Sequence, residues 1–236
     1  MAIRSSQHHT TSHIVAPTIK VYEEGARTFL KRWTARRKRS SALLTEWMAG
    51  LPRGAPVLDL GCGGGQDAQV LRRERYRVVG MDLTAAFLRV AREAVPSLPL
   101  VRADMRELPF RAASFDGVWA AASLIHLPKA DATRALRALR LLVKPGATLA
   151  ATLTYGTKSG LLTKCWMPGR YFARWKKDEL ARALRRAGWQ VLSVHVVSNL
   201  ERKGRWINVI ARSSDNLPPG TLNSIFKQAG LKKGPN

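Results

Sequence analysis

A glycine-rich loop carries the strongest chemical signal in the sequence. An apolar run, 56–60, contains Asp59 and leads into Gly61, Gly63 and Gly65. Glycines at this spacing let the backbone turn tightly and approach a ligand closely, and the pattern lacks the third glycine of a dinucleotide loop. A carboxylate beside such a loop disfavours a pyrophosphate and favours a ligand with an ammonium group. The loop therefore indicates a site for a cationic ligand.

A second acid fits the same ligand. Asp82 lies 21 positions after Gly61, at the end of the next apolar run, 77–82. At this spacing its carboxylate is placed to accept hydrogen bonds from ribose hydroxyls. Asp59 and Asp82 together indicate a nucleoside cofactor rather than a glycine turn without a ligand.

The elements that must position these residues alternate along the chain. The expected strands cover 56–61, 77–82, 99–103, 115–121, 147–154, 189–197 and 205–211. The expected helices among them cover 66–75, 84–94, 131–143 and 177–187. Strands that alternate with helices predict an α/β fold with a parallel sheet covered on both faces. The last two strands are separated by a short polar turn, so the seven-stranded, mostly parallel sheet should end in an antiparallel hairpin.

The segments before and after this region lack the alternation of strands and helices. Two short helices are expected over 19–33 and 41–48, with the basic cluster Arg36–Arg39 between them. Residues 1–17 show no apolar stripe and are expected to form a disordered tail, while 213–236 are expected to form an appended basic tail. The sequence thus predicts a single domain over 18–212.

Composition bears on partners and compartment. Lys and Arg total 40 against 16 for Asp and Glu, a formal net charge of +24. Such a chain attracts polyanions without specificity, although GC-rich coding alone can produce the same excess of arginine. Cys62 and Cys165 lie far apart, which predicts neither a disulfide framework nor a metal site. No apolar run approaches the ~20 residues that span a bilayer, so we expect no specific membrane association and a cytoplasmic location.

From about residue 19 to 212 the chain resembles the class I S-adenosylmethionine-dependent methyltransferases. The motifs that carry the resemblance are Asp59–Gly65, Asp82, Ala103–Met105, Phe115–Trp119, Leu124–Pro128 and Lys144–Gly146. The resemblance implies a Rossmann-like fold, S-adenosyl-L-methionine as cofactor and methyl transfer as the activity. It also implies that 18–50 form a helical lid, because Tyr22, Phe29 and Trp33 match the aromatic spacing of the lid helix.

The resemblance assigns roles residue by residue. The implied cofactor-binding residues are Asp59, Gly61, Gly63, Gly65, Asp82, Leu83, Asp104, Met105, Ala120 and Ala121. Among them the glycines line the methionine part, the acid at 82 holds the ribose, and the pair 104–105 frames adenine. The implied acceptor-binding residues are Tyr22, Ser123, Arg170 and Tyr171.

The implied methyl transfer needs few catalytic side chains. A methyl group leaves a sulfonium as a neutral thioether departs, so alignment and exclusion of water can supply most of the acceleration. A general base is optional. His126 is the candidate by position and by the ordinary pKa of histidine, and a packing role beneath the lid remains open beside it.

The acceptor stays open at this level. Where small-molecule relatives carry an acidic stretch, this chain has the acid-free segment Tyr155–Gly160, which favours an anionic over a cationic acceptor. The favoured function is methylation of a small, anionic or neutral acceptor. An RNA (tRNA) methyltransferase, suggested by the charge and by Arg36–Arg39, is the alternative, and a non-catalytic cofactor-binding scaffold is a second one.

Overall fold

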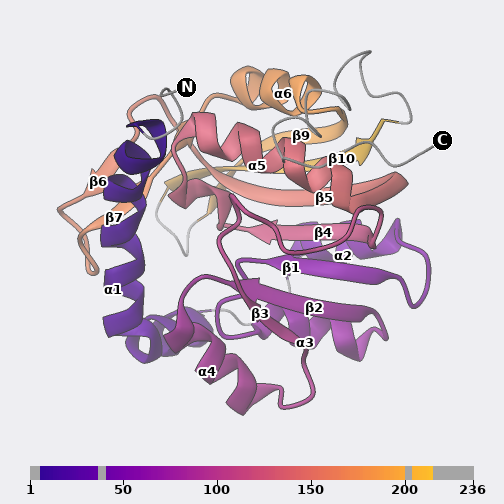
Figure 1. The fold of residues 1–236 in the computed structure, drawn as a ribbon, viewed down its shortest axis with the longest axis horizontal. Coiled ribbons are helices and arrows are strands. Elements are labelled where there is room, and N and C mark those ends of the chain that lie inside the picture. The colour runs from indigo at the N-terminus through magenta and orange to yellow at the C-terminus, as the bar shows by residue number, and fades with distance from the viewer. Residues whose placement is uncertain (1–5, 37–40, 200–203, 215–236) are drawn as a thin grey trace.

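The computed structural model describes residues 6–36, 41–199 and 204–214, and it has the expected α/β architecture (Figure 1). The strands are β1 (Pro56–Leu60), β2 (Arg77–Asp82), β3 (Leu100–Arg102), β4 (Phe115–Ala121), β5 (Val143–Tyr155), β6 (Gly160–Leu162), β7 (Arg170–Phe172), β8 (Arg174–Trp175), β9 (Trp189–Asn199) and β10 (Gly204–Ser213). The helices are α1 (Ser6–Arg36), α2 (Ala42–Ala49), α3 (Gln66–Arg73), α4 (Ala85–Ala94), the short 3₁₀ helix η1 (Leu124–His126), α5 (Lys129–Leu142) and α6 (Lys177–Arg186). Within these residues no helix combines the length and apolarity that a membrane span needs.

The main sheet confirms the predicted topology. Seven strands follow the order β3-β2-β1-β4-β5-β10-β9, with β1 to β5 parallel and β10 antiparallel to both β5 and β9. Because β1 is parallel to both of its neighbours, β2 and β4, the carboxyl ends of these strands lie at the same edge of the sheet. In open α/β sheets ligands bind at this edge, where the strand order reverses.

Side-chain alternation along the strands separates two cores. Val57 packs with α2 and α3 on one face of β1, and its neighbour Leu58 packs with α5 and α6 on the other. This period of two follows from the pleat of a strand, and it explains why the strands of a sheet buried on both faces read as continuous apolar runs.

The segment between β5 and α6 has more structure than the sequence predicted. β6 and β7 form an antiparallel pair, and β8 pairs in parallel with the end of β5, adding an eighth strand to the sheet. Figure 1 shows β6 and β7 beside α1, outside the main sheet. These strands are three or fewer residues long. Such short strands give almost no period-two signal.

The N-terminal helix corrects a prediction. The expected disordered tail over 1–17 is wrong for residues 6–17, which belong to α1. Over 13–33, where the burial of α1 is described, the buried positions are Val15, Thr18, Tyr22, Ala26 and Leu30. Their spacing is helical, but threonine and alanine hide the apolar stripe, and Pro17 reads as a helix breaker although it lies inside α1.

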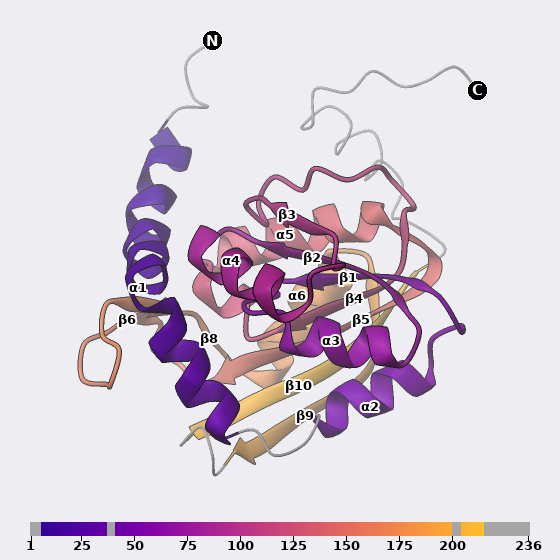
Figure 2. The same ribbon diagram turned by 90° about the horizontal axis from the view of Figure 1, so that it is seen from below.

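The predicted lid over 18–50 also needs correction. Only α1 crosses the carboxyl edge of the sheet, whereas α2 packs on a sheet face, where Trp47 Nε1 donates to Thr148 Oγ1 at 2.8 Å. Figure 2 shows α1 along one side of the molecule and α2, which follows it in the chain, against the sheet. The cluster 37–39 and most of the expected basic tail, from 215 onward, lie outside the described residues.

The burial of Val15 makes the corrected helix testable. Val15 is 5% exposed, whereas the side chain of its neighbour Ala16 lies on the exposed side of α1. Replacing Val15 with Asp places an unpaired carboxylate in the core and should lower the free energy of unfolding by about 2–4 kcal/mol. Ala16→Asp should change it by less than about 0.5 kcal/mol. Denaturant unfolding of both variants measures the difference, and equal stabilities would contradict the packing of this turn.

Candidate active site

The glycine loop has the backbone that the sequence predicted. Gly61, Gly63 and Gly65 have φ angles of 74°, 53° and 80°, which residues with a Cβ adopt only with strain. A Cβ on Gly61 would lie 2.3 Å from the Cβ of Ser123, so the loop contacts the segment after β4 directly. A Cβ on Gly63 would meet nothing within 4 Å. The loop is therefore packed on one side and open on the other.

Asp82 is held against this loop. One oxygen, Oδ2, accepts from the backbone N–H of Gly63 at 3.0 Å, and Oδ1 accepts from that of Thr84 at 2.8 Å. Burial nevertheless raises the pKa of Asp82 above its usual range, and the two hydrogen bonds oppose that shift. The carboxylate is thus fixed in orientation before any ligand binds.

A second carboxylate makes the surroundings of the loop negative. Burial raises the pKa of the Cys62 thiol well above its usual value, and the charges of Asp59 and Asp82 raise it further. Both carboxylates therefore act on the same point of the loop. A negative field of this kind stabilises a cation and opposes a pyrophosphate.

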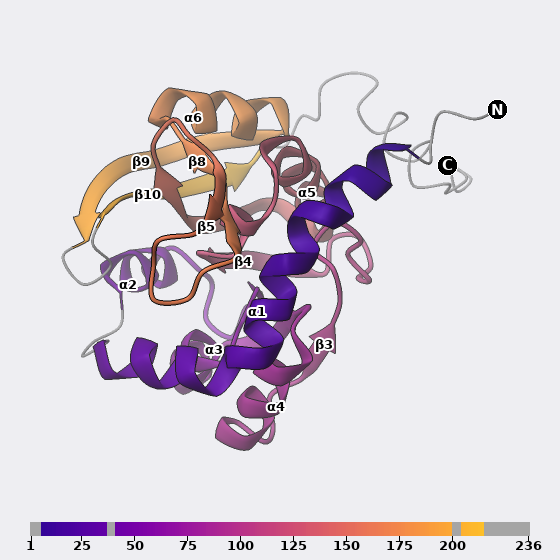
Figure 3. The same cartoon turned by 90° about the vertical axis from the view of Figure 1, so that its left-hand side faces the viewer.

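Helix α1 reaches the site through Tyr22 and Glu23. Figure 3 shows α1 running across the ends of the strands. The Glu23 carboxylate accepts from the backbone N–H groups of Ala85 at 2.6 Å and Ala86 at 2.9 Å, the first two residues of α4. Thr84 stands at the N-cap position but makes no side-chain capping bond, so a residue from another helix caps α4. The sequence contained no signal for this contact, because the partners are 62 and 63 positions apart.

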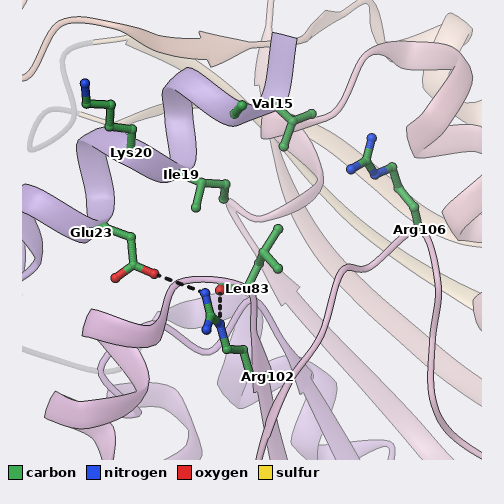
Figure 4. Close-up of a pocket in the computed structure, with 8 residues that line it drawn as sticks. Val15, Ile19, Lys20, Glu23, Leu83, Arg102 and Arg106 are labelled. Carbon is green, nitrogen blue, oxygen red and sulfur yellow. Dashed lines mark hydrogen bonds and ion pairs between the residues drawn. The ribbon is translucent and has the colours of Figure 1, made fainter. Parts of the chain in front are cut away.

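A cavity of about 430 Å³ opens beside this contact. The residues that line it are Val15, Ala16, Ile19, Lys20, Glu23, Leu83, Arg102 and Arg106. Figure 4 shows Glu23 from α1 facing Arg102 across it, with an Nη2–Oε1 separation of 3.7 Å. Leu83, assigned above to the cofactor site, forms part of its wall. The cavity therefore adjoins the place where the resemblance puts the adenosine.

Asp104 has a partner that the sequence analysis missed. Arg106 contacts both carboxylate oxygens, at 3.0 Å from Nε and at 2.6 Å from Nη2, and its backbone N–H donates to Oδ1 at 2.9 Å. This pairing raises the pKa of Arg106. An adenine amine would have to share Asp104 with this guanidinium or displace it. Met105 packs at the edge of the larger core.

Three of the four expected acceptor residues, Tyr22, Arg170 and Tyr171, meet with His126 in one chain of hydrogen bonds. Arg170 Nη1 donates to the Tyr22 hydroxyl at 3.2 Å, and that hydroxyl lies 3.0 Å from His126 Nε2. His126 Nδ1 lies 2.8 Å from the carbonyl oxygen of Tyr171, which can only accept. Nδ1 therefore carries the proton, and Nε2 accepts from Tyr22. Each group in this series donates to the next, from Arg170 through Tyr22 and His126 to the Tyr171 carbonyl, and the series joins β7, α1 and η1.

This environment alters His126. Burial lowers its pKa to about 4, the Tyr171 carbonyl opposes that shift, and the charge of Arg170 adds to it. His126 is thus neutral near pH 7, and its one lone pair is already engaged. A base works best with a pKa near the working pH, so this geometry disfavours the general-base role and favours the packing and orienting role.

Arg170 is a buried cation in an aromatic enclosure. Its residue is 5% exposed, and its guanidinium carbon lies 5.4–5.9 Å from the ring centres of Tyr22, Phe29, Trp166 and Phe172. Its Nε donates to the carbonyl of Met167 at 3.0 Å. Among the described residues no carboxylate forms an ion pair with it. Aromatic faces stabilise the charge in place of an acid.

Not every predicted residue presents its side chain to this site. Ala120 is fully buried in the larger core and Ala121 packs against the smaller one, so only their backbone can face a ligand. Tyr171 contributes its backbone: its carbonyl faces His126, and its N–H donates to Thr18 Oγ1 at 2.8 Å. Ser123 stands close to Gly61 with a buried Oγ that has no hydrogen-bond partner among the described residues.

The residues present fit S-adenosylmethionine. Glycines 61 and 63 supply a backbone surface without side chains, and Asp59 with Asp82 supplies the negative field that its ammonium and sulfonium groups require. The orphaned Ser123 hydroxyl lies against the same loop. Within the described residues, no cluster of three potential metal ligands is present.

Comparison with known proteins shows the class of protein. Residues 57–146 match the family model described as a methyltransferase domain, and the chain therefore carries a class I S-adenosylmethionine-dependent methyltransferase domain. A second model, described as the HicA toxin of bacterial toxin-antitoxin, matches 178–231. The described part of that span contains most of α6 together with β9 and β10, which complete the methyltransferase sheet.

Individual relatives have varied acceptors. The methyltransferase GfsG of Streptomyces halstedii is 38% identical over 41% of this chain and 37% of its own, and the trans-aconitate 2-methyltransferase of Azoarcus sp. is 35% identical over 57% and 53%. The chain thus spans about a third to a half of the length of these relatives. The structure of the 1,6-didemethyltoxoflavin-N1-methyltransferase of Burkholderia thailandensis, which holds that acceptor and S-adenosylhomocysteine, has a TM-score of 0.70 at 21% identity, covering 91% of this chain and 93% of its own. That likeness shows a shared fold.

The lowered pKa of His126 predicts a loss of stability in acid. Between about pH 6.5 and pH 4 the unfolded chain binds a proton at this histidine and the folded chain does not, so stability falls as the pH falls through that window. The loss should reach about 3 kcal/mol and should be smaller in His126→Asn. His195→Asn, at an exposed histidine on β9, is the control and should keep the full pH dependence. Unfolding by denaturant at pH 7 and pH 4 measures both, and a wild-type protein equally stable at the two values would contradict the burial of His126.

Proposed function

We propose that this protein is an enzyme that transfers the methyl group of S-adenosylmethionine to a small acceptor carrying an anionic or neutral group. The observation that carries the proposal is the placement of two opposite electrostatic surroundings around Tyr22. Burial raises the pKa of Tyr22. The positive charge of Arg170 lowers this pKa, and the negative charge of Asp82 raises it. A cation-binding loop and a buried cation therefore both act on this one side chain.

Different residues of the chain bind the cofactor and the acceptor. Asp59, the glycine loop and Asp82 hold the cofactor, which supplies an electrophilic methyl group when bound. Arg170 and Tyr22 orient the acceptor from the opposite side, and α1 covers the edge of the sheet and excludes water. Exclusion of water strengthens every charge interaction in the site and favours transfer to the acceptor over reaction with water.

RNA remains a second candidate because of one observation, the formal net charge of +24. Transfer of radiolabelled methyl groups to a size-fractionated cell extract, with and without ribonuclease, distinguishes the candidates. The proposal expects label in the small-molecule fraction, insensitive to ribonuclease. Label confined to a ribonuclease-sensitive fraction at near-physiological salt would replace a small acceptor with RNA, since a shaped site survives screening over ~8 Å whereas loose attraction does not.

The basic cluster permits an independent check of the RNA candidate. Replacing Arg36, Arg37, Lys38 and Arg39 with Gln should leave methylation of a small acceptor unchanged. If RNA is the substrate, the same change should abolish its methylation and flatten the log–log salt dependence of binding by about 0.7–0.9 per lost phosphate contact.

Binding of the cofactor has its own test. Asp82→Ala removes hydrogen bonds from ribose hydroxyls to a charged acceptor and should weaken S-adenosylmethionine binding by about ten- to a thousandfold. Asp116→Ala is the matched control, because Asp116 lies at the start of β4 in an ion pair with Lys144. Calorimetry measures both, with thermal unfolding to check the fold. Unchanged affinity in Asp82→Ala, or tight binding of NAD by the wild type, would contradict the proposal.

A further inference from the structure

Among the described residues, no group that acts on Tyr22 or His126 can readily take a proton from an acceptor at neutral pH. The titratable groups that act on Tyr22 and His126 are Arg170 on β7, Cys165 before it and Asp82 at the end of β2. Arginine has no acceptor, and the Cys165 thiol lies 3.1 Å from the carbonyl of Met167. Both oxygens of Asp82 accept from backbone N–H groups, and the function proposed above gives their remaining lone pairs to the ribose hydroxyls.

The two residues at the centre of the site do not supply a base either. The His126 lone pair accepts from the Tyr22 hydroxyl, and its other nitrogen donates to the backbone. The Tyr22 hydroxyl accepts from Arg170, and burial raises its pKa above its ordinary value, which keeps the phenol protonated. An alcohol or an ammonium acceptor would have to lose a proton during transfer, and these residues offer it no acceptor.

Arg170 can supply an anchor for an acceptor that needs no base. Its hydrogen bonds to Met167 and Tyr22 use two of the five N–H donors of a guanidinium. A carboxylate is ionised at neutral pH, and it matches the planar fork of a guanidinium better than any other small anion except phosphate. Of these two anions, the carboxylate matches the single positive charge of Arg170, whereas a phosphate group carries a charge of about −1.5 to −2 near pH 7. An ionised carboxylate oxygen can be methylated without loss of a proton.

We infer that the methylated atom is a carboxylate oxygen of the acceptor and that the product is a methyl ester. The inference rests on the function proposed above and names the acceptor group. One carboxylate oxygen is held by Arg170, and the other donates the electron pair that forms the new C–O bond. The electron pair of the breaking C–S bond stays on sulfur as a thioether. A cation and an anion become two neutral groups, no proton is released, and a site shielded from water favours such charge neutralisation.

The experiment uses the chemistry of the product. Wild-type protein is incubated with S-adenosylmethionine labelled in its methyl group and with the small-molecule fraction of an extract, and the products are treated with mild alkali. Methyl esters release volatile labelled methanol under these conditions, whereas methyl ethers and N-methyl groups keep their label. We expect alkali-labile label, and Arg170→Gln should reduce it at least about tenfold. Arg137→Gln, at an exposed arginine on α5, removes the same charge and should leave it unchanged.

The outcomes separate this inference from the function on which it rests. Alkali-stable label overturns the inference while the methyltransferase function stands. Absence of alkali-labile label from a protein that binds the cofactor by calorimetry also overturns the inference. Absence of both cofactor binding and label contradicts the proposed function itself.

A second measurement does not depend on turnover. NMR titration of the histidines, with His126→Asn used to assign the signal, should find His126 uncharged down to about pH 5 and protonated at Nδ1. The signal of the exposed His195 is followed in the same spectra. A His126 that titrates near pH 7 would provide the missing base and overturn the inference.

Discussion

The contact between the Tyr22 hydroxyl and the groups on either side of it holds the acceptor side of the site together. Arg170 and His126 come from β7 and η1, which are also joined by the contact of His126 Nδ1 with the Tyr171 carbonyl and by the backbone N–H of Ala173, which donates to the Ile125 carbonyl at 2.7 Å. Tyr22 adds the lid helix to this junction. Because one side chain bonds to both groups, the position of α1, the tautomer of His126 and the orientation of Arg170 are interdependent. A change in one of them changes the other two.

The same helix also determines the cofactor side. Glu23, adjacent to Tyr22, accepts from the N–H groups at the start of α4 that have no partner within the helix, directly after the Asp82 turn. A carboxylate at a helix N-terminus is favoured by the unpaired donors and by the helix dipole. Two successive residues of α1 therefore contact opposite sides of the candidate site, so α1 couples the turn at Asp82 to the hydrogen-bonded chain of Arg170, Tyr22 and His126.

The electrostatic layout of the site differs from that of the whole chain. The formal net charge is +24, yet the loop next to Cys62 experiences two carboxylates, and the only buried cation described beside Tyr22 is Arg170. Local burial and geometry, rather than net charge, determine which ligand charge is stabilised at each point. The large positive charge acts at long range on any polyanion and is screened by salt, so it says little about the acceptor.

The sequence by itself determined the sheet, the glycine loop and the two acids that flank it. These features are local: apolar runs of strand length, glycines at positions of positive φ, and acids at strand ends all depend on neighbours in the chain. Only the tertiary structure decided that residues 6–17 extend α1, that Glu23 caps α4, that Arg106 pairs with Asp104 and that His126 is buried with a pKa of about 4. Three of these features depend on contacts between distant segments, and Arg106 depends on the shape of the turn after β3. The physical reason is that a side chain's burial and its hydrogen-bond partners depend on which elements pack together in the folded chain. The spacing of residues along the chain predicts the apolar face of each element but not the element that packs on it.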